Sequence, residues 1–306
     1  MPLSPNLRGA VFMSVSMAGF TMSDAISKTV AETMNMGQVM LVRGVFATLF
    51  VAAIAWHRGA FANFGSVANP YVVLRAACET AATVCFLVAL AHLPLATVSA
   101  VLQALPLAVT MGAALAFSEK VGWRRWLAIL IGFAGVMIIV RPGFEGFSVY
   151  SLLTLVCVFF AAVRDLVTKR IPAPIPSLLV SFVTAVTVTA CGAALIEPMG
   201  GWSPLTPWNV GMLAVGASML VVGYQFIIEA MRMGDISFIA PFRYTALLWA
   251  IVLGFVVFGD VPDLAMAIGA AIVVGSGLFT LYRERAVGRR PIVAESSREP
   301  ATPDGL

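Results

Sequence analysis

The sequence predicts an all-α membrane protein in which ten transmembrane helices form two inverted five-helix repeats around a central cavity. Three observations predict this fold. Of the 306 residues, 60% are hydrophobic and only 11% are charged, whereas soluble domains carry about 25% charged residues. Ten apolar runs are each long enough to cross a hydrocarbon core of about 30 Å. The two halves of the chain also superpose at a constant offset.

The ten apolar runs predict the ten helices. Lipid cannot satisfy free backbone N–H and C=O groups, so continuous apolar runs of this length are expected to be helical. Turn formers such as Asn35-Met36-Gly37 and Arg141-Pro142-Gly143 separate them, and a polar tail follows at 286–306. The runs cover 7–27, 38–56, 71–91, 96–117, 124–140, 149–168, 178–196, 208–230, 237–258 and 264–282.

An offset of 141 residues brings five spans onto five spans. It places Asp24 on Asp165, Lys28 on Lys169, Thr48 on Thr189, Gln103 on Tyr244 and Glu119 on Asp260. We interpret residues 1–145 and 146–285 as two repeats. Because each repeat has an odd number of spans, the second must insert upside down. Inverted repeats are typical of secondary transporters, whose substrate sites lie near the midplane between the repeats.

Loop charges predict the orientation. With the N-terminus in the cytoplasm, thirteen of the 19 Lys and Arg residues lie on the cytoplasmic side and two lie outside. The positive-inside rule then places both chain ends in the cytoplasm. The net charge of +4 is spread between apolar runs rather than gathered on one face, so we expect no nucleic-acid partner.

Enzyme motifs are absent from the sequence. It contains no Gly-x-Ser-x-Gly, His-Glu-x-x-His or Walker motif, so we expect neither an enzyme nor ATP-driven transport. The four cysteines lie inside apolar runs and are interpreted as small core side chains. No cofactor and no metal site are expected.

The segment 118–143, which begins Ser-Glu-Lys-Val-Gly-Trp-Arg-Arg-Trp, resembles the fourth-to-fifth-helix region of EamA-type transporters of the drug/metabolite transporter superfamily. The segment 94–106 fits the same family, and the resemblance extends over about 8–285. It implies a ten-helix basket in a bacterial inner membrane, with helices 1–4 and 6–9 lining the cavity and helices 5 and 10 outside. The stretch Gly223-Tyr224-Gln225-Phe226 contributes to a narrower likeness to YddG-type exporters.

The resemblance implies export of small hydrophobic metabolites, foremost aromatic and other amino acids, by alternating access. The alternatives are a sugar-phosphate, nucleotide-sugar or drug carrier of the same superfamily and a non-transporting membrane partner protein. The expected partners are therefore a small-molecule substrate and the lipid bilayer. Small residues on the fifth and tenth spans permit close helix packing within one chain, so we expect a monomer or a weak dimer.

Charged residues inside spans are costly and need a partner or water, which makes them candidates for gating or proton coupling. Residues three or four apart share a helix face and form four candidate ion pairs. Arg43 stands apart from these pairs and is expected to extend toward the membrane surface. The pairs are Asp24 with Lys28, Asp165 with Lys169, Arg75 with Glu79 and Glu229 with Arg232.

Polar and aromatic side chains in the cavity-lining spans are candidates for substrate binding, because ligand pockets combine apolar walls with a few polar groups. Arg243 has no acidic residue within four positions, so it can hold a substrate carboxylate or pair with another helix. Pro106 and Pro241 interrupt the fourth span of each repeat and are candidate hinges. The binding candidates are Gln103, Tyr244, Arg243, Thr83, Tyr224, Gln225 and Trp249.

Overall fold

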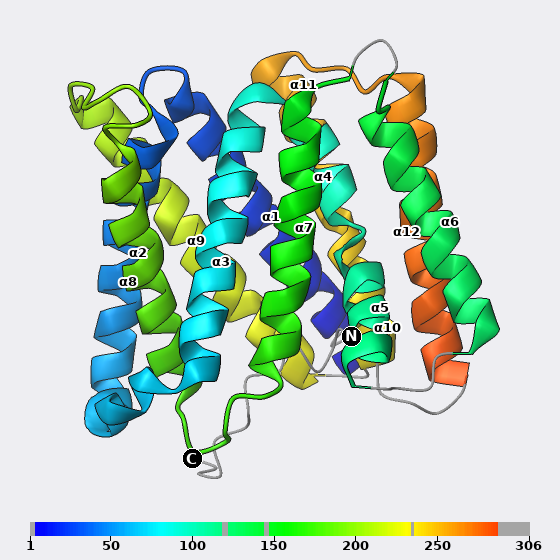
Figure 1. The fold of residues 1–306 in the computed structure, drawn as a ribbon, viewed down its shortest axis with the longest axis horizontal. Helices are drawn as coiled ribbons and strands as arrows, with labels where there is room; N and C mark the ends of the chain where they lie inside the picture. The colour runs from blue at the N-terminus through cyan, green and yellow to red at the C-terminus, as the bar shows by residue number, and fades with distance from the viewer. Residues whose placement is uncertain (1–3, 118–121, 144–146, 234–235, 287–306) are drawn as a thin grey trace.

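The computed structural model describes residues 4–117, 122–143, 147–233 and 236–286. Glu119, one half of a repeat match, and all but the first residue of the predicted tail lie outside these ranges. The described part is helical (Figure 1). Its α-helices are α1 (Pro5–Ala31), α2 (Met36–His57), α3 (Pro70–His92), α4 (Leu95–Leu102), α5 (Leu105–Ala116), α6 (Trp123–Val140), α7 (Val149–Thr168), α8 (Ser177–Leu195), α9 (Pro207–Met233), α10 (Ile236–Ile239), α11 (Thr245–Phe258) and α12 (Leu264–Ala286). Two 3₁₀ helices are η1 (Ala60–Ala68) and η2 (Ala240–Tyr244).

Ten helical segments of the described chain are long and apolar enough to cross a membrane, which confirms the predicted all-helical membrane fold. The fourth span consists of α4 and α5, and the ninth consists of η2 and α11. Large apolar side chains cover the outer faces, such as Leu49 and Val256, which are 61% and 72% exposed. An apolar outer surface of this kind suits lipid, since lipid contributes no hydrogen bonds.

Polar caps and prolines set the starts of several spans. The side chains of Ser4, Asn35, Asn69 and Ser148 each accept a hydrogen bond from a backbone N–H in the first turn of α1, α2, α3 and α7. Proline also stands in the first turn of α1 and α3, where its missing N–H removes no helical bond. These caps explain why α1, α2, α3 and α7 begin at these residues.

The spans pack in pairs that each join the first half of the chain to the second. The pairs are α1 with α9, α2 with α8, α3 with α7, α4 with α11, and α6 with α12 (Figure 1). Exchanging each span for its counterpart in the other half turns the α1–α9 pair into the α7–α3 pair and maps the other pairs onto themselves. This is the pattern that two halves related by a two-fold axis would produce.

Thr48 and Thr189 meet where α2 crosses α8. Their Oγ1 atoms are 3.2 Å apart and share a hydrogen bond, and they are the residues that the 141-residue offset superposes. Equivalent residues of two halves contact one another only near a two-fold axis. The contact therefore agrees with the inverted repeat predicted from the sequence.

Glycines allow α6 and α12 to approach closely within the chain. A Cβ added at Gly135 would lie 2.9 Å from the carbonyl oxygen of Gly269, and one added at Gly269 would lie 2.6 Å from the carbonyl oxygen of Gly135. Small residues permit such backbone contact between membrane helices. Gly135 and Gly269 are thus accounted for by packing inside one chain.

Asp263 stabilises the corner between α6 and α12. Its Oδ1 accepts a hydrogen bond of 2.7 Å from the backbone N–H of Met266 and contacts the guanidinium of Arg141, which itself has a left-handed backbone with φ of 51°. The hydrogen bond from the Met266 N–H is the main cause that lowers the pKa of the Asp263 carboxyl, burial opposes it, and the Arg141 side chain lowers this pKa further.

We expect Asp263→Ala to lower the free energy of unfolding by about 1 kcal/mol, as for other N-cap losses. Since the folded pKa is depressed, the ionised carboxylate stabilises the fold above the unfolded pKa of about 3.9 and loses this effect as the pH falls below it. Thermal unfolding in detergent at pH 7 and pH 3 measures the difference, with exposed Glu197→Ala as the control. A gap between wild type and Asp263→Ala that is as large at pH 3 as at pH 7 would refute this account.

Candidate substrate cavity

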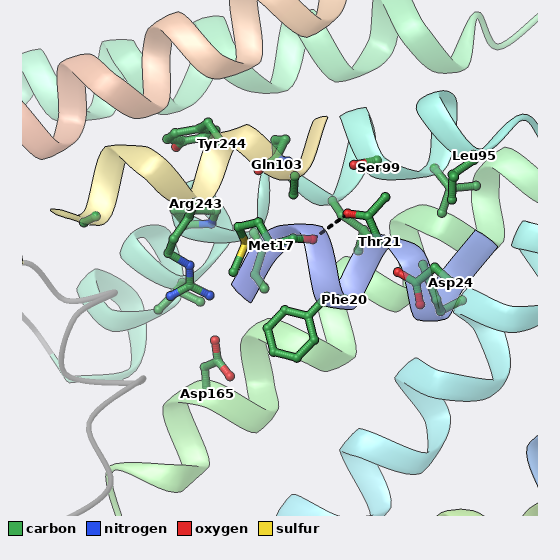
Figure 2. Close-up of a pocket in the computed structure, with 18 of the residues that line it drawn as sticks. Met17, Phe20, Thr21, Asp24, Leu95, Ser99, Gln103, Asp165, Arg243 and Tyr244 are labelled. Atoms are coloured by element: carbon green, nitrogen blue, oxygen red, sulfur yellow. Dashed lines mark hydrogen bonds between the residues drawn. The ribbon is translucent and has the colours of Figure 1, made fainter. Parts of the chain in front are cut away.

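A cavity of about 220 Å³ lies within the bundle, between spans from both halves of the chain (Figure 2). Its walls come from α1, α3, α4, α5, α7, η2, α11 and α12. The resemblance implied a cavity lined by the first four spans of each repeat. That expectation is wrong in part, since the described lining includes Leu281 of α12 and no residue of α2, α8 or α9. The lining residues are Met17, Phe20, Thr21, Asp24, Phe86, Leu95, Val98, Ser99, Leu102, Gln103, Leu105, Pro106, Val109, Asp165, Ala240, Arg243, Tyr244, Ala246 and Leu281.

The fourth span is interrupted beside the cavity. Pro106 has no N–H and its ring crowds the carbonyl of Leu102, and α4 ends at Leu102 before α5 begins at Leu105. Gln103 lies in this break and lines the cavity with only 8% of its surface exposed.

The ninth span, which is the repeat counterpart of the fourth, is also irregular beside the cavity. Pro241 lies in η2. Arg243 and Tyr244, which line the cavity, belong to the same 3₁₀ helix. Both sequence-predicted hinges therefore coincide with interruptions. Discontinuous helices of this kind supply the midplane substrate sites of many transporters.

Charged groups stand at the two ends of the cavity. Figure 2 shows Asp24 at one end and Arg243 with Asp165 at the other, with Met17, Phe20 and Thr21 of α1 between them. The hydroxyl of Thr21 donates to the Met17 carbonyl at 2.8 Å, so its oxygen remains an acceptor toward the cavity. The arrangement offers an apolar and aromatic middle, with a carboxylate at one end and a guanidinium beside a second carboxylate at the other.

Asp24 pairs with Arg43 of α2. The Arg43 Nη1 atom is 3.9 Å from the Asp24 Oδ1 atom and donates to the Ser27 hydroxyl at 3.0 Å. The Arg43 side chain is only 12% exposed, so the prediction that it extends to the membrane surface is wrong. The predicted Asp24–Lys28 pair is replaced as well, because α2 brings a cation to the carboxylate from a second helix.

Lys28 instead joins α1 to the end of α3. Its Nζ donates to the carbonyl oxygens of Leu90 at 2.9 Å and Leu93 at 2.7 Å, and it lies 5.4 Å from the centre of the Phe258 ring. The last carbonyls of a helix have no partner within the helix, so an ammonium group satisfies them. Lys28 thus links three spans from outside the cavity.

Arg164 links two acidic residues on α3 and α7. Its Nη1 lies 2.7 Å from Glu79 Oε2, and its Nη2 lies 2.7 Å from Asp165 Oδ1. Arg75 donates elsewhere, to the hydroxyls of Thr168 at 3.1 Å and Thr184 at 2.8 Å. The sequence indicated Lys169 for Asp165 and Arg75 for Glu79. Arg164 is the partner of both carboxylates, because the α3–α7 contact places it between them.

Residues 7–141, which are less than half of the 306 residues, match the EamA-like transporter family. This similarity to a transporter family supports the prediction that the chain is not an enzyme, and it agrees with the resemblance carried by segment 118–143.

Two relatives and one solved structure are also similar to this chain. The riboflavin transporter of Vibrio cholerae is 35% identical over 193 residues, which are 62% of this chain and 64% of the relative. The S-adenosylmethionine uptake transporter of Rickettsia prowazekii is 24% identical over 284 residues, covering 92% and 95%. A crystal structure shares the fold with a TM-score of 0.58 at 19% identity, covering 89% and 98%. The named relatives do not support the narrower likeness to YddG-type exporters.

Several predicted residues lie away from the cavity lining. Tyr224 packs edge to face on Phe20 with ring centres 5.0 Å apart, and Trp249 Nε1 donates to the Ser14 carbonyl at 3.2 Å. Gln225 is exposed. The remaining predicted residues that are not among the lining residues are Lys28, Arg75, Glu79, Thr83, Lys169, Glu229, Arg232 and Pro241.

The cavity also holds residues that sequence reasoning did not select, namely Met17, Phe20, Thr21, Phe86 and Ser99. Apolar side chains in a membrane span give no sign of which face they occupy. Within the described residues, no group of three His, Cys, Asp or Glu side chains is placed to hold a metal ion.

Proposed function

We propose that this EamA-like chain is a secondary transporter that moves a small organic molecule with an aromatic ring and a charged group by alternating access. The observation that carries the proposal is the cavity beside two interrupted spans, with Asp24 and Arg243 at opposite ends. Transporter sites near the midplane between repeats use such interrupted helices. The family match and the packing of one half against the other support the same function.

The cavity suits a small zwitterion. Phe20 and Phe86 offer ring contacts, Arg243 offers a guanidinium to an anionic group, and Asp24 offers a carboxylate to a cationic one. Ligand pockets usually measure about 300–1,000 Å³, so a cavity of about 220 Å³ favours a ligand at the small end. Aromatic amino acids meet these requirements, and we propose their export from the cytoplasm of a bacterium, with both chain ends inside.

Riboflavin is the second candidate substrate. The similarity to the Vibrio cholerae riboflavin transporter favours it, and its ring system suits the aromatic walls. Riboflavin carries no carboxylate, so it would not need the charges at the two ends of the cavity. The two candidates therefore differ in how far they depend on Arg243.

Alternating access requires the two ends of the cavity to open in turn. Lys28 joins α1, α3 and the end of α11 beyond one end, and Arg164 joins α3 and α7 beyond the other. The interruptions at Pro106 and Pro241 are the proposed hinges. Asp24 and Asp165 are the proposed proton acceptors if transport is coupled to protons, while facilitated diffusion would need neither.

Counterflow in proteoliposomes tests this proposal. Labelled tryptophan, phenylalanine, threonine, riboflavin and S-adenosylmethionine are offered with and without a pH gradient. We expect flux of the aromatic amino acids, and a loss of at least about tenfold in Arg243→Gln, since a hydrogen bond to a charged group contributes about 1.5–3 kcal/mol. Arg124→Gln, at the exposed start of α6, is the matched control.

The outcomes separate the candidates. Flux of riboflavin alone, unchanged in Arg243→Gln, would replace the amino acid proposal with the riboflavin one. Absence of flux for every compound, from protein shown to be folded, would contradict a transport function for these substrate classes.

A further inference from the structure

Asp165 and Arg243 face one another across the cavity from two different spans of the second half of the chain. Asp165 belongs to α7 and Arg243 to η2, and both line the same cavity. Figure 2 shows the carboxylate of Asp165 and the guanidinium of Arg243 pointing toward one another at the end away from Asp24. The negative charge of Asp165 acts electrostatically on Arg243.

Asp165 also has a second cationic partner, Arg164. Arg164 donates to Asp165 Oδ1 through Nε at 2.8 Å and approaches the same atom through Nη2 at 2.7 Å. The Asp165 side chain is 15% exposed and that of Arg164 is 22% exposed. Asp165 therefore stays charge-compensated by Arg164 if Arg243 turns to another anion.

Arg243 lies inside the membrane-spanning bundle, where a cation is costly without an anionic partner. Such a residue favours any carboxylate that enters the cavity, and Asp165 is the carboxylate of the chain that it faces there. A ligand carboxylate and Asp165 would therefore compete for one guanidinium.

We propose that Asp165 is an internal substitute for the carboxylate of the substrate, occupying Arg243 while the cavity is empty and yielding it when substrate binds. The inference rests on the proposed function and extends it to substrate selection. The cavity then selects molecules that carry a carboxylate beside an aromatic ring and discriminates against their amides. Displacement also removes one electrostatic link between α7 and η2, so substrate entry loosens the contact between these two spans of the second half.

Equilibrium binding in lipid nanodiscs tests the inference without requiring transport. The probes are three acid and amide pairs: tryptophan with tryptophanamide, phenylalanine with phenylalaninamide, and indole-3-acetate with indole-3-acetamide. Wild type, Asp165→Asn, Arg243→Gln and the double variant are compared, and Glu197→Gln on the exposed surface serves as the control that removes an equal charge.

In Asp165→Asn we expect the acids to bind about three- to tenfold more tightly than in wild type. If Arg243 is competent to bind substrate in about 10–30% of wild-type molecules, the apparent affinity of wild type is weakened about three- to tenfold. The amides should be unchanged. In Arg243→Gln the preference for acids over amides should disappear, with or without Asp165. Glu197→Gln should match wild type.

The contrary results are equally defined. Weaker binding of the acids in Asp165→Asn would make Asp165 a ligand of the substrate and overturn the inference, as would equal gains for acids and amides. Failure of every acid to bind both wild type and Asp165→Asn would also overturn it. If Asp165→Asn does not fold, Arg243→Gln still tests the inference. A preference for acids over amides that is retained in Arg243→Gln would by itself overturn the inference. Binding as expected, without counterflow, would support the inference and contradict the transport proposal.

Discussion

Replacing Gly277 by alanine is expected to lower substrate flux by at least about tenfold and to destabilise the protein. A Cβ at this position of α12 would lie 1.8 Å from the Tyr244 hydroxyl and 2.7 Å from its Cζ. The Tyr244 ring is only 7% exposed and packs on Ala240 and Leu281, so it has to move into the cavity that it lines. Overpacking of this kind costs about 1–3 kcal/mol.

The same helix offers a matched control. A Cβ at Gly275 meets no atom within 4 Å, so Gly275→Ala should leave flux unchanged and preserve or slightly raise the unfolding temperature, as glycine is the poorer helix former. Tyr244→Phe removes the atom that the new Cβ would strike. The double variant Gly277→Ala with Tyr244→Phe should therefore recover part of the lost flux and part of the lost thermal stability. If Gly277→Ala behaved like Gly275→Ala, the close packing of Tyr244 on α12 would be refuted.

The spans were predictable from the sequence because lipid imposes a simple physical demand. A segment that crosses the hydrocarbon must be helical, apolar and about 20 residues long, and all three properties are local. The expected run at 96–117 corresponds to Leu95–Ala116. The interruption of this run at Gln103 also follows from a local cause, the chemistry of Pro106.

The partners of the charged residues were not predictable in the same way. Spacing along one helix indicated Lys28 for Asp24, but the structure gives this carboxylate Arg43 of another helix. Which cation reaches a carboxylate depends on helix rotation and on the neighbour that packs beside it. The adjacent pair Arg164-Asp165 inside an apolar run was the available signal for Arg164, because two charges in one span imply a partner on another.

Arg243, Gln103 and Tyr244 were selected because a polar or cationic side chain deep in a span needs an explanation, and all three line the cavity. Phe20 and Phe86 carry no such signal, since an aromatic ring is equally at home against lipid. Sequence reasoning therefore found the charged residues of the candidate site with Gln103 and Tyr244, and missed its apolar walls and the hydroxyls of Thr21 and Ser99.

Removing the guanidinium of Arg164 is expected to have the largest effect on stability. Arg164→Gln leaves Glu79 and Asp165 without the cation that contacts both carboxylates at 2.7 Å, and their side chains are only 21% and 15% exposed. Breaking a buried ion pair from one side costs about 3–5 kcal/mol, because the remaining charge is uncompensated. Thermal and denaturant unfolding in detergent measure the loss, and Arg124→Gln on the exposed start of α6 is the control for removing a guanidinium.

The charge origin of this effect can be separated from lost packing. Arg164→Gln combined with Glu79→Gln removes the cation together with the Glu79 carboxylate, while Asp165 still faces Arg243. The double variant should then be more stable than Arg164→Gln alone, because a neutral amide can hydrogen-bond where an unpaired carboxylate cannot. A double variant as unstable as Arg164→Gln would show that the packing of the Arg164 side chain, rather than its charge, joins α3 to α7.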